Sequence, residues 1–244
     1  MSSSSNFVVE SCDVDSEEGV KLHTRIFKPR DEQVSDDGDL AIVLVHPFSL
    51  LGGCQALLKG IASELACKGF KAVTLDTRGA GKSTGRATLT GFAEVKDVIA
   101  VCRWVSQNLG AHRILLVGSS AGKVSTFPSN LSVWILLSAP IAGSAVEQVE
   151  QVVGYVSLGY PFGLMASVLF GRHHKAILSS PKPKLFVMGT QDGFTSVSQL
   201  KKKLKSSAGR TETHLLEGVS HFQMEGPEYD SQMADVICNF ISSL

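Results

Sequence analysis

Short apolar runs alternate with helix-like segments through most of this chain. The runs at 40–45, 71–75 and 114–117 are bounded by turn residues, which is typical of strands buried on both faces. The segments between them carry apolar residues at helical spacing and end at glycine. Because parallel strands need crossover connections, this alternation predicts an α/β fold: a mostly parallel central β-sheet with helices on both faces.

The same patterns place the remaining elements. An antiparallel pair of strands is expected first, at 7–12 and 21–27. Further helices are expected at 55–68, 92–109, 197–205 and 232–241, and later strands at 184–188 and 213–216. At 244 residues without a low-complexity linker, we expect one domain over residues 1–244.

Composition excludes several classes of protein. Lys plus Arg and Asp plus Glu number 23 each, for a formal charge of zero, so we expect no nucleic-acid partner held by a basic face. No apolar run is long enough to span a membrane, and the serine-rich start lacks the features of a secretory signal. The five cysteines form no C-x-x-C pair, so we expect no zinc site, a cytoplasmic location, and core positions for Cys67, Cys102 and Cys238.

One motif indicates nucleophilic chemistry. Gly118-Ser119-Ser120-Ala121-Gly122 has the form G-x-S-x-G and directly follows an expected buried strand. Small flanking residues let the backbone close into a sharp strand-to-helix turn, which presents the central serine at the sheet edge. Ser120 is therefore the candidate nucleophile.

Two later residues complete a catalytic set. Asp192 follows the expected strand at 184–188, and His221 lies in the loop after the strand at 213–216. The order Ser120, Asp192, His221 is the order expected of a serine hydrolase built on a doubly covered sheet. Taken singly, Asp192 could cap a helix and His221 could be a surface residue.

With these motifs the sequence resembles the α/β-hydrolase superfamily over nearly its whole length. The further matching elements are His46-Pro47-Phe48 with Gly52-Gly53, and the D-x-R-G-x-G-x-S turn at 76–83. The resemblance implies that the backbone N–H groups of Phe48 and Ala121 form an oxyanion hole. It also implies a largely structural role for the turn at 76–83.

Other polar residues invite different interpretations. His46 is interpreted as a strand-end residue that supports the oxyanion turn. His173 and His174 lie between Arg172 and Lys175 and are interpreted as part of a solvated basic patch rather than a metal site. Gly81-Lys82-Ser83 imitates a phosphate-binding loop, but Asp76 stands where that loop needs glycine, so nucleotide binding is not expected.

The segment after the elbow departs from the family pattern. A helix should start there, but Pro128 and several β-branched residues oppose one, and 133–137 looks like a strand. We expect residues 123–138 to be an insertion, with the displaced helix at 139–152 and the next strand at 153–158. The alternative is a very short helix followed by a genuine strand at 133–137.

The resemblance and the three candidate residues predict a serine hydrolase that cleaves a small carboxylic ester or thioester through an acyl-enzyme. The expected partner is a small acyl substrate, and no cofactor or metal is expected. Residues 159–184 are a candidate small apolar lid. The main alternative is a catalytically impaired α/β-hydrolase-like protein that acts as a ligand-binding or interaction module; a peptidase would need a larger cap. The sequence does not determine the oligomeric state.

Overall fold

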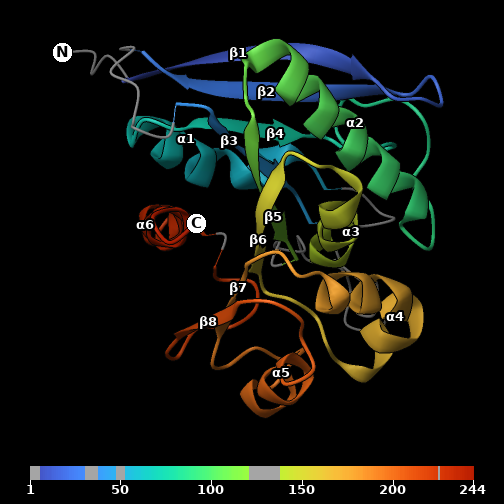
Figure 1. The fold of residues 1–244 in the computed structure, drawn as a ribbon, viewed down its shortest axis with the longest axis vertical. Helices are drawn as coiled ribbons and strands as arrows, with labels where there is room; N and C mark the ends of the chain where they lie inside the picture. Colours follow the sequence, from blue (N-terminus) through green and yellow to red (C-terminus); the bar gives the residue numbers. More distant parts are fainter. Residues whose placement is uncertain (1–5, 31–37, 48–52, 121–137, 225) are drawn as a thin grey trace, which may run out of the picture.

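The computed structural model describes residues 6–30, 38–47, 53–120, 138–224 and 226–244. Within them, eight strands form one sheet in the order β1-β2-β4-β3-β5-β6-β7-β8 (Figure 1). β1 (Phe7–Asp15) and β2 (Lys21–Pro29) are the expected antiparallel pair, and β2 is also antiparallel to β4 (Lys71–Leu75). All other neighbours run parallel, so the predicted α/β class is confirmed.

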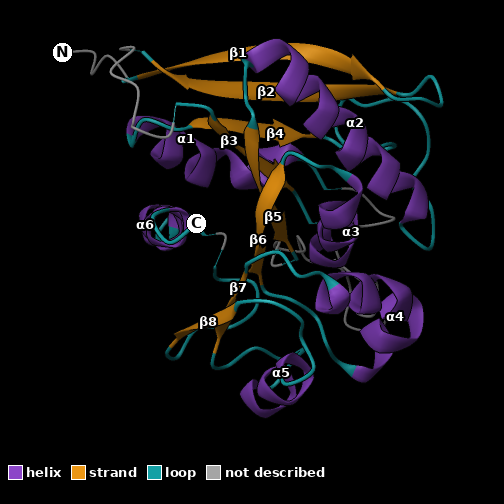
Figure 2. Ribbon diagram, viewed as in Figure 1, coloured by secondary structure: helices purple, strands orange, loops and turns teal. Residues whose placement is uncertain are grey.

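The parallel strands are β3 (Leu40–Val45), β4, β5 (Arg113–Ser119), β6 (Val152–Leu158), β7 (Lys184–Gly189) and β8 (Thr211–Leu216). Helices cover both faces of this sheet (Figure 2). One face carries α1 (Lys59–Cys67) and α6 (Asp230–Ile241). The other carries α2 (Phe92–Leu109), α3 (Ser138–Ala145) and α4 (Leu164–Ser179), and α5 (Val197–Leu204) adds Leu200 to the same core.

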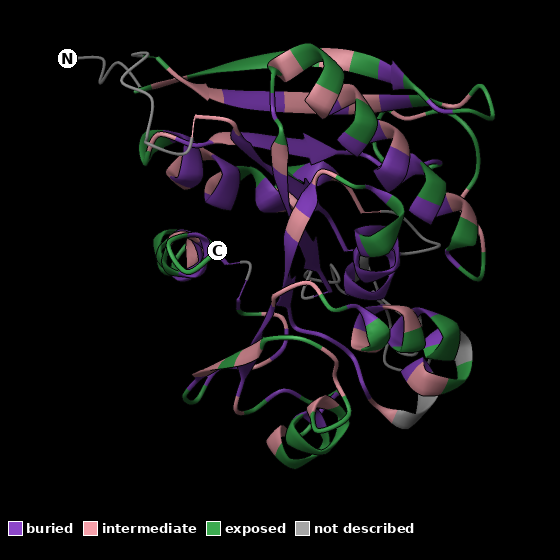
Figure 3. Ribbon diagram, in the orientation of Figure 1, coloured by how far each residue is buried: buried purple, intermediate pink, exposed green. Residues whose placement is uncertain are grey.

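The alternation of side chains along β3 explains why two cores exist. Ala41, Val43 and Val45 join the cluster under α2 and α3, whereas Ile42 and Leu44 join the cluster under α1 and α6. Every residue of β3 is buried, as Figure 3 shows for the central strands. Continuous apolar runs of this kind are what a strand covered on both faces requires.

The region after β5 agrees with the sequence only in part. Residues 123–138, with the alternative strand at 133–137, fall almost wholly outside the described residues, so the insertion stays a prediction. α3 begins at Ser138, close to the expected start of the displaced helix. It ends earlier than residue 152, however: a short 3-10 turn at Val146–Gln148 and three non-helical residues separate it from β6.

α3 packs directly onto the end of β5. A Cβ atom built on Gly118 would lie 2.8 Å from the Ala139 Cα atom and 2.8 Å from the Ala142 Cβ atom. Only glycine permits so close an approach of helix to strand at this point. α3 therefore packs closely against the carboxyl end of β5.

Candidate active site

Three loops at the carboxyl edge of the sheet bring the predicted catalytic residues together. Ser120 follows β5, Asp192 follows β7, and His221 lies in the loop after β8. The backbone N–H of Ser120 donates to the carbonyl of Leu158 at the end of β6, at 2.9 Å. All three residues are buried. The fold thus unites positions that lie far apart in the sequence.

Asp192 and His221 form a hydrogen-bonded pair. Nδ1 of His221 lies 2.5 Å from Oδ2 of Asp192. The other carboxylate oxygen, Oδ1, accepts from the backbone N–H groups of Phe194 at 2.7 Å and Thr195 at 2.9 Å. Asp192 therefore does not cap α5, whose N-cap is Ser196. Its carboxylate is held in one orientation and fixes the imidazole ring in turn.

Ser120 contacts His221 through the Ser120 backbone carbonyl. Nε2 of His221 lies 2.6 Å from the carbonyl oxygen of Ser120, while Ser120 Oγ accepts from the Ala139 N–H at 3.1 Å. Among the described residues, no hydrogen bond joins Ser120 Oγ to His221. The two oxygens that contact the His221 ring, Asp192 Oδ2 and the Ser120 carbonyl oxygen, are both acceptors, so this arrangement suits an imidazole that carries a proton on each nitrogen. The hydroxyl points instead to the N-terminal turn of α3.

The strand-end histidine is fixed by two backbone contacts, whereas its expected support of the oxyanion turn stays a prediction. His46 is buried; its Nδ1 donates to the Pro47 carbonyl at 2.8 Å and its Nε2 accepts from the Thr77 N–H at 3.3 Å. Burial lowers the pKa of His46, so the ring stays neutral and suits both contacts. Phe48 and Ala121, the predicted oxyanion donors, lie outside the described residues.

The turn at 76–83 is held by hydrogen bonds within it and to residues outside it. The Asp76 carboxylate accepts from the Gln55 N–H at 2.8 Å, and the Ser83 hydroxyl donates to the Asp76 carbonyl at 2.7 Å. The Arg78 guanidinium binds the buried Asp97 carboxylate at 2.7 Å. A carboxylate at the centre of the turn would repel a phosphate, which agrees with the structural role implied by the resemblance.

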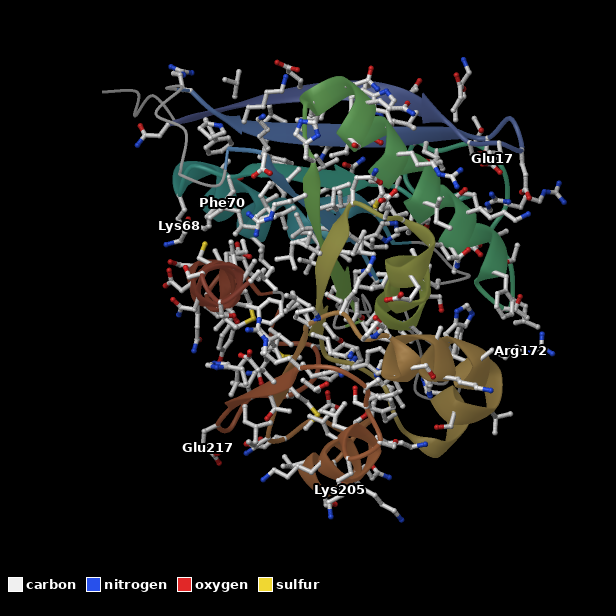
Figure 4. The ribbon with its side chains drawn as sticks, in the orientation of Figure 1. Glu17, Lys68, Phe70, Arg172, Lys205 and Glu217 are labelled. Atoms are coloured by element: carbon white, nitrogen blue, oxygen red, sulfur yellow. The ribbon has the colours of Figure 1, made fainter. Side chains whose placement is uncertain are left out.

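The interpretation of His173 and His174 as a solvated patch is wrong. Both side chains are buried, whereas Arg172 points outward from α4 (Figure 4). His173 contacts Ser144 Oγ through Nδ1 at 2.7 Å and donates from Nε2 to the Thr90 carbonyl at 2.7 Å. Helical geometry turns neighbouring residues to different sides, so the charged neighbours in the sequence gave a misleading signal.

His174 lies in an aromatic cluster on the same side of the sheet. Its ring centre is 5.4 Å from that of Tyr160 and 5.2 Å from that of Phe162. Burial, with the nearby charge of Lys203, lowers the pKa of His174 to about 4. This histidine is therefore a neutral core residue.

The cysteine predictions hold only in part. Cys102 is buried, but Cys238 is half-buried and Cys67 is exposed at the last position of α1, so the core position expected for Cys67 is wrong. Within the described ranges, no cluster of three His, Cys, Asp or Glu side chains could hold a metal ion. None of the described helices is both long and apolar enough to cross a bilayer.

Two aromatic residues beside His221 were missed from the sequence. The Phe194 ring centre lies 4.5 Å from that of His221, and the Phe222 ring centre lies 5.2 Å away at 90°. Phe194 comes two residues after Asp192, and Phe222 directly follows His221. Their proximity to candidate catalytic residues in the sequence was the signal that could have identified them.

The comparisons with known proteins agree with this architecture. Residues 18–129 match the family model of X-Pro dipeptidyl-peptidase (S15 family). The fold is similar to that of an α/β serine hydrolase homologue from Coxiella burnetii, with a TM-score of 0.72 and 23% identity, covering 93% of this chain and 95% of that one. No curated protein was found to match the chain.

Two further structures share the fold at lower identity. An esterase from Pyrococcus furiosus has a TM-score of 0.72 and 16% identity, covering 97% of this chain and 91% of that one. An α/β serine hydrolase without lid from Xanthomonas campestris has a TM-score of 0.70 and 18% identity, covering 93% and 92%. The sheet and these structures together show that the chain has the α/β-hydrolase fold, and the family-model match over residues 18–129 agrees with it.

Proposed function

We propose that this chain is a serine hydrolase that cleaves small carboxylic esters or thioesters. Ser120 is the nucleophile, His221 the general base and Asp192 the group that orients and stabilises the imidazole. One observation carries the proposal: a single buried imidazole, His221, contacts both the Asp192 carboxylate and residue 120 at the carboxyl edge of the sheet.

The proposed reaction has two stages. Nε2 of His221 takes the proton from Ser120 Oγ, which attacks the carbonyl carbon of the substrate. The leaving oxygen or sulfur departs with that proton, and an acyl group remains on Ser120. Water then attacks the acyl-enzyme with His221 again as base, releasing the acid. The negatively charged oxygen formed in each stage needs donors, each worth on the order of 3 kcal/mol, and the resemblance assigns these to the N–H groups of Phe48 and Ala121.

Catalysis requires two local movements from the geometry observed. Nε2 of His221 must leave the Ser120 carbonyl, and Ser120 Oγ must turn from the Ala139 N–H toward the imidazole. A neutral ring supports this exchange, because an unprotonated Nε2 accepts from a hydroxyl and gains nothing from a carbonyl. The second movement is a rotation about one side-chain bond, between staggered rotamers.

We further propose that residues 123–138 are an insertion, as the sequence predicts. The chain leaves the elbow and returns to the same point, since Ser120 Oγ and the Ala139 nitrogen are 3.1 Å apart. This contact puts the two Cα atoms at most about 7 Å apart, whereas three steps between Cα atoms reach roughly 11 Å. Two residues, Ala121 and Gly122, are therefore enough to join Ser120 directly to Ala139.

Deleting residues 123–138 tests this second proposal. The shortened chain is expected to fold with a higher melting temperature and to hydrolyse ester faster, because the N–H of Ala121 then adjoins the N-terminus of α3. A shortened chain that lost both thermal stability and turnover would contradict the insertion.

The candidate lid at 159–184 remains a proposal as well. This segment contains α4, and its first residues include the buried aromatic side chains of Tyr160 and Phe162. A Cβ atom on Gly163 would collide with the Phe194 carbonyl, so the start of α4 packs against the loop that follows Asp192. We propose that the segment contributes to substrate selection through this contact.

One observation favours a second function, that of a catalytically impaired ligand-binding or interaction module. Ser120 Oγ is hydrogen-bonded to the Ala139 N–H rather than to His221, so the proposed nucleophile and the proposed base share no hydrogen bond through the hydroxyl. If the two local movements do not occur, the same fold binds a small ligand without turnover. Reactivity of Ser120 distinguishes the two functions.

A fluorophosphonate probe tests that reactivity. The wild-type protein is expected to become labelled, and Ser120→Ala to remain unlabelled. Ser144→Ala is the matched control, because Ser144 Oγ also contacts a histidine, at 2.7 Å, but no carboxylate orients that ring. Absence of label in folded wild-type protein would favour the binding module.

The substrate class needs separate assays. The similarity to the S15 peptidase model makes an X-Pro amide the most informative rival substrate, although the matched residues include neither Asp192 nor His221. Faster turnover of p-nitrophenyl acetate and an acetyl thioester than of an X-Pro p-nitroanilide is expected. The reverse order would replace the esterase proposal with a peptidase one.

A further inference from the structure

The loop after Asp192 exposes an aromatic ring next to His221. The exposed fraction of Phe194 is 47%, although its ring centre lies only 4.5 Å from that of the buried His221 imidazole. Phe222 stands edge-on to both rings, 5.5 Å from Phe194 and 5.2 Å from His221. These two phenylalanines form an apolar corner, here called the Phe194–Phe222 corner, directly beside the proposed general base.

The exposed ring is mounted on a loop fixed at several points. The Phe194 N–H donates to Asp192 Oδ1 at 2.7 Å. The next residue, Thr195, donates its hydroxyl to the Tyr160 carbonyl at 3.1 Å and accepts from the Phe162 N–H at 2.7 Å. Such a ring loses little conformational freedom when a ligand packs against it, which favours binding.

The chemistry of the proposed reaction decides which part of an ester meets this corner. His221 must deliver its proton to the leaving oxygen, so that oxygen lies within hydrogen-bond reach of Nε2 during acylation. The group attached to the leaving oxygen therefore lies beside the imidazole, where the Phe194–Phe222 corner stands. The acyl group is bonded to Ser120 and extends from the other side of the reacting carbon.

We propose that the Phe194–Phe222 corner binds the leaving group, so that the site selects esters of apolar or aromatic alcohols. This inference rests on the proposed function and names the half of the substrate that determines specificity. An aromatic leaving group would pack against the two rings, edge to face or offset, and would cover apolar surface that is otherwise exposed to water.

Phe92 provides a control matched in geometry. Its ring lies 4.5 Å from that of a buried histidine, His173, and 44% of its surface is exposed. It differs in place, since it begins α2 and adjoins no candidate catalytic residue. Phe92→Ala thus removes an exposed ring from a histidine without touching the proposed leaving-group site.

The test compares four esters in which one half varies at a time: methyl, butyl and benzyl acetate, and methyl hexanoate. In Phe194→Ala, kcat/KM for benzyl acetate is expected to fall about tenfold, while methyl acetate and methyl hexanoate change less than about twofold. Phe194→Leu should recover part of the loss, and Phe92→Ala should leave all four values unchanged. Because all three acetates form one acetyl-enzyme, deacylation should be the same for each.

Two results would overturn the inference. One is an equal loss for all four esters in Phe194→Ala, which would indicate a general effect on His221. The other is a loss that follows the acyl group, with methyl hexanoate affected most.

A binding measurement separates this inference from the proposed function. Benzyl alcohol should shift the NMR signals of the His221 ring protons in the wild-type protein and not in Phe194→Ala. If no ester is hydrolysed but this binding occurs, the Phe194–Phe222 corner is an apolar ligand site, and the hydrolase proposal and the leaving-group assignment both fail. If esters are hydrolysed and benzyl alcohol binds both proteins equally, the inference fails and the hydrolase proposal stands.

Discussion

Two histidines in this protein have similar surroundings and different chemistry. His221 and His173 are both buried, each contacts a serine, and each has an exposed phenylalanine ring 4.5 Å away. Nδ1 of His221 faces a carboxylate, that of Asp192. His173 instead donates from Nε2 to a backbone carbonyl and accepts from the Ser144 hydroxyl through Nδ1.

The difference shows that contact between serine and histidine does not by itself define a catalytic site. His173 has the serine contact that a general base requires, but no anion stabilises its protonated form, and burial lowers its pKa. It joins α3 and α4 to the loop before α2. His221 has the anion and stands at the carboxyl edge of the sheet, although its serine contact is to the backbone.

The largest expected effect comes from removing the negative charge of Asp192, which contacts His221 and has no counterpart at His173. Asp192→Asn is expected to lower kcat about 1,000-fold to 10,000-fold, because the amide can no longer stabilise a protonated His221 or fix its tautomer. Steady-state ester hydrolysis measures this change. The control, His173→Gln, should keep kcat within about twofold of the wild-type value. A comparable loss in both variants would contradict the proposed difference between the two histidines.

The second prediction concerns stability at the other site. Ser144→Ala leaves Nδ1 of buried His173 without its donor, and the free energy of unfolding is expected to fall by about 1–3 kcal/mol while ester turnover is unchanged. Urea denaturation gives the first value. In a double-mutant cycle with His173→Gln, the loss of unfolding free energy in the double mutant should be smaller than the sum of the losses in the two single mutants. Strict additivity would mean that the contact contributes nothing.

The smallest expected effect is a pH dependence of stability. Burial lowers the pKa of His46, His173 and His174 in the folded state, so below about pH 6.5 the unfolded chain takes up more protons than the folded one. The stability that comes from keeping these three histidines neutral is therefore present above that pH and is lost as the pH falls. For His174, with a pKa of about 4, the loss between pH 7 and 5 is about 1–2 kcal/mol.

His174→Gln should flatten the pH dependence by this amount, measured as the difference in unfolding free energy between pH 7 and pH 5. The difference is informative even if the variant is less stable at both values. A slope unchanged from the wild-type protein would show that His174 is not held neutral.

Most of the fold was predictable because its signals are local and strong. The continuous apolar runs at 40–45 and 71–75 coincide with β3 and β4, and the helix at 92–109 coincides with α2, bounded by Gly91 and Gly110. Both glycines adopt positive φ, which residues inside a helix do not, so Gly91 marks where α2 begins and Gly110 where it ends. The order of Ser120, Asp192 and His221 followed from strand ends.

The details of the candidate site were not predictable, because they depend on tertiary contacts. The orientation of Ser120 Oγ is set by Ala139, which the sequence separates from it by the segment 123–138. The burial of His173 depends on α4 packing against α3 and the loop before α2. The exposed ring of Phe194 could be located only after its loop was placed beside His221.

A crystal structure of the protein after reaction with a fluorophosphonate tests the central claim most directly. Our account predicts a covalent phosphorus–oxygen bond to Ser120 Oγ, with that oxygen released from the Ala139 N–H and Nε2 of His221 turned from the Ser120 carbonyl toward the adduct. A phosphonate attached to another residue, or an intact protein in which Ser120 remains bonded to Ala139 after prolonged exposure, would contradict it.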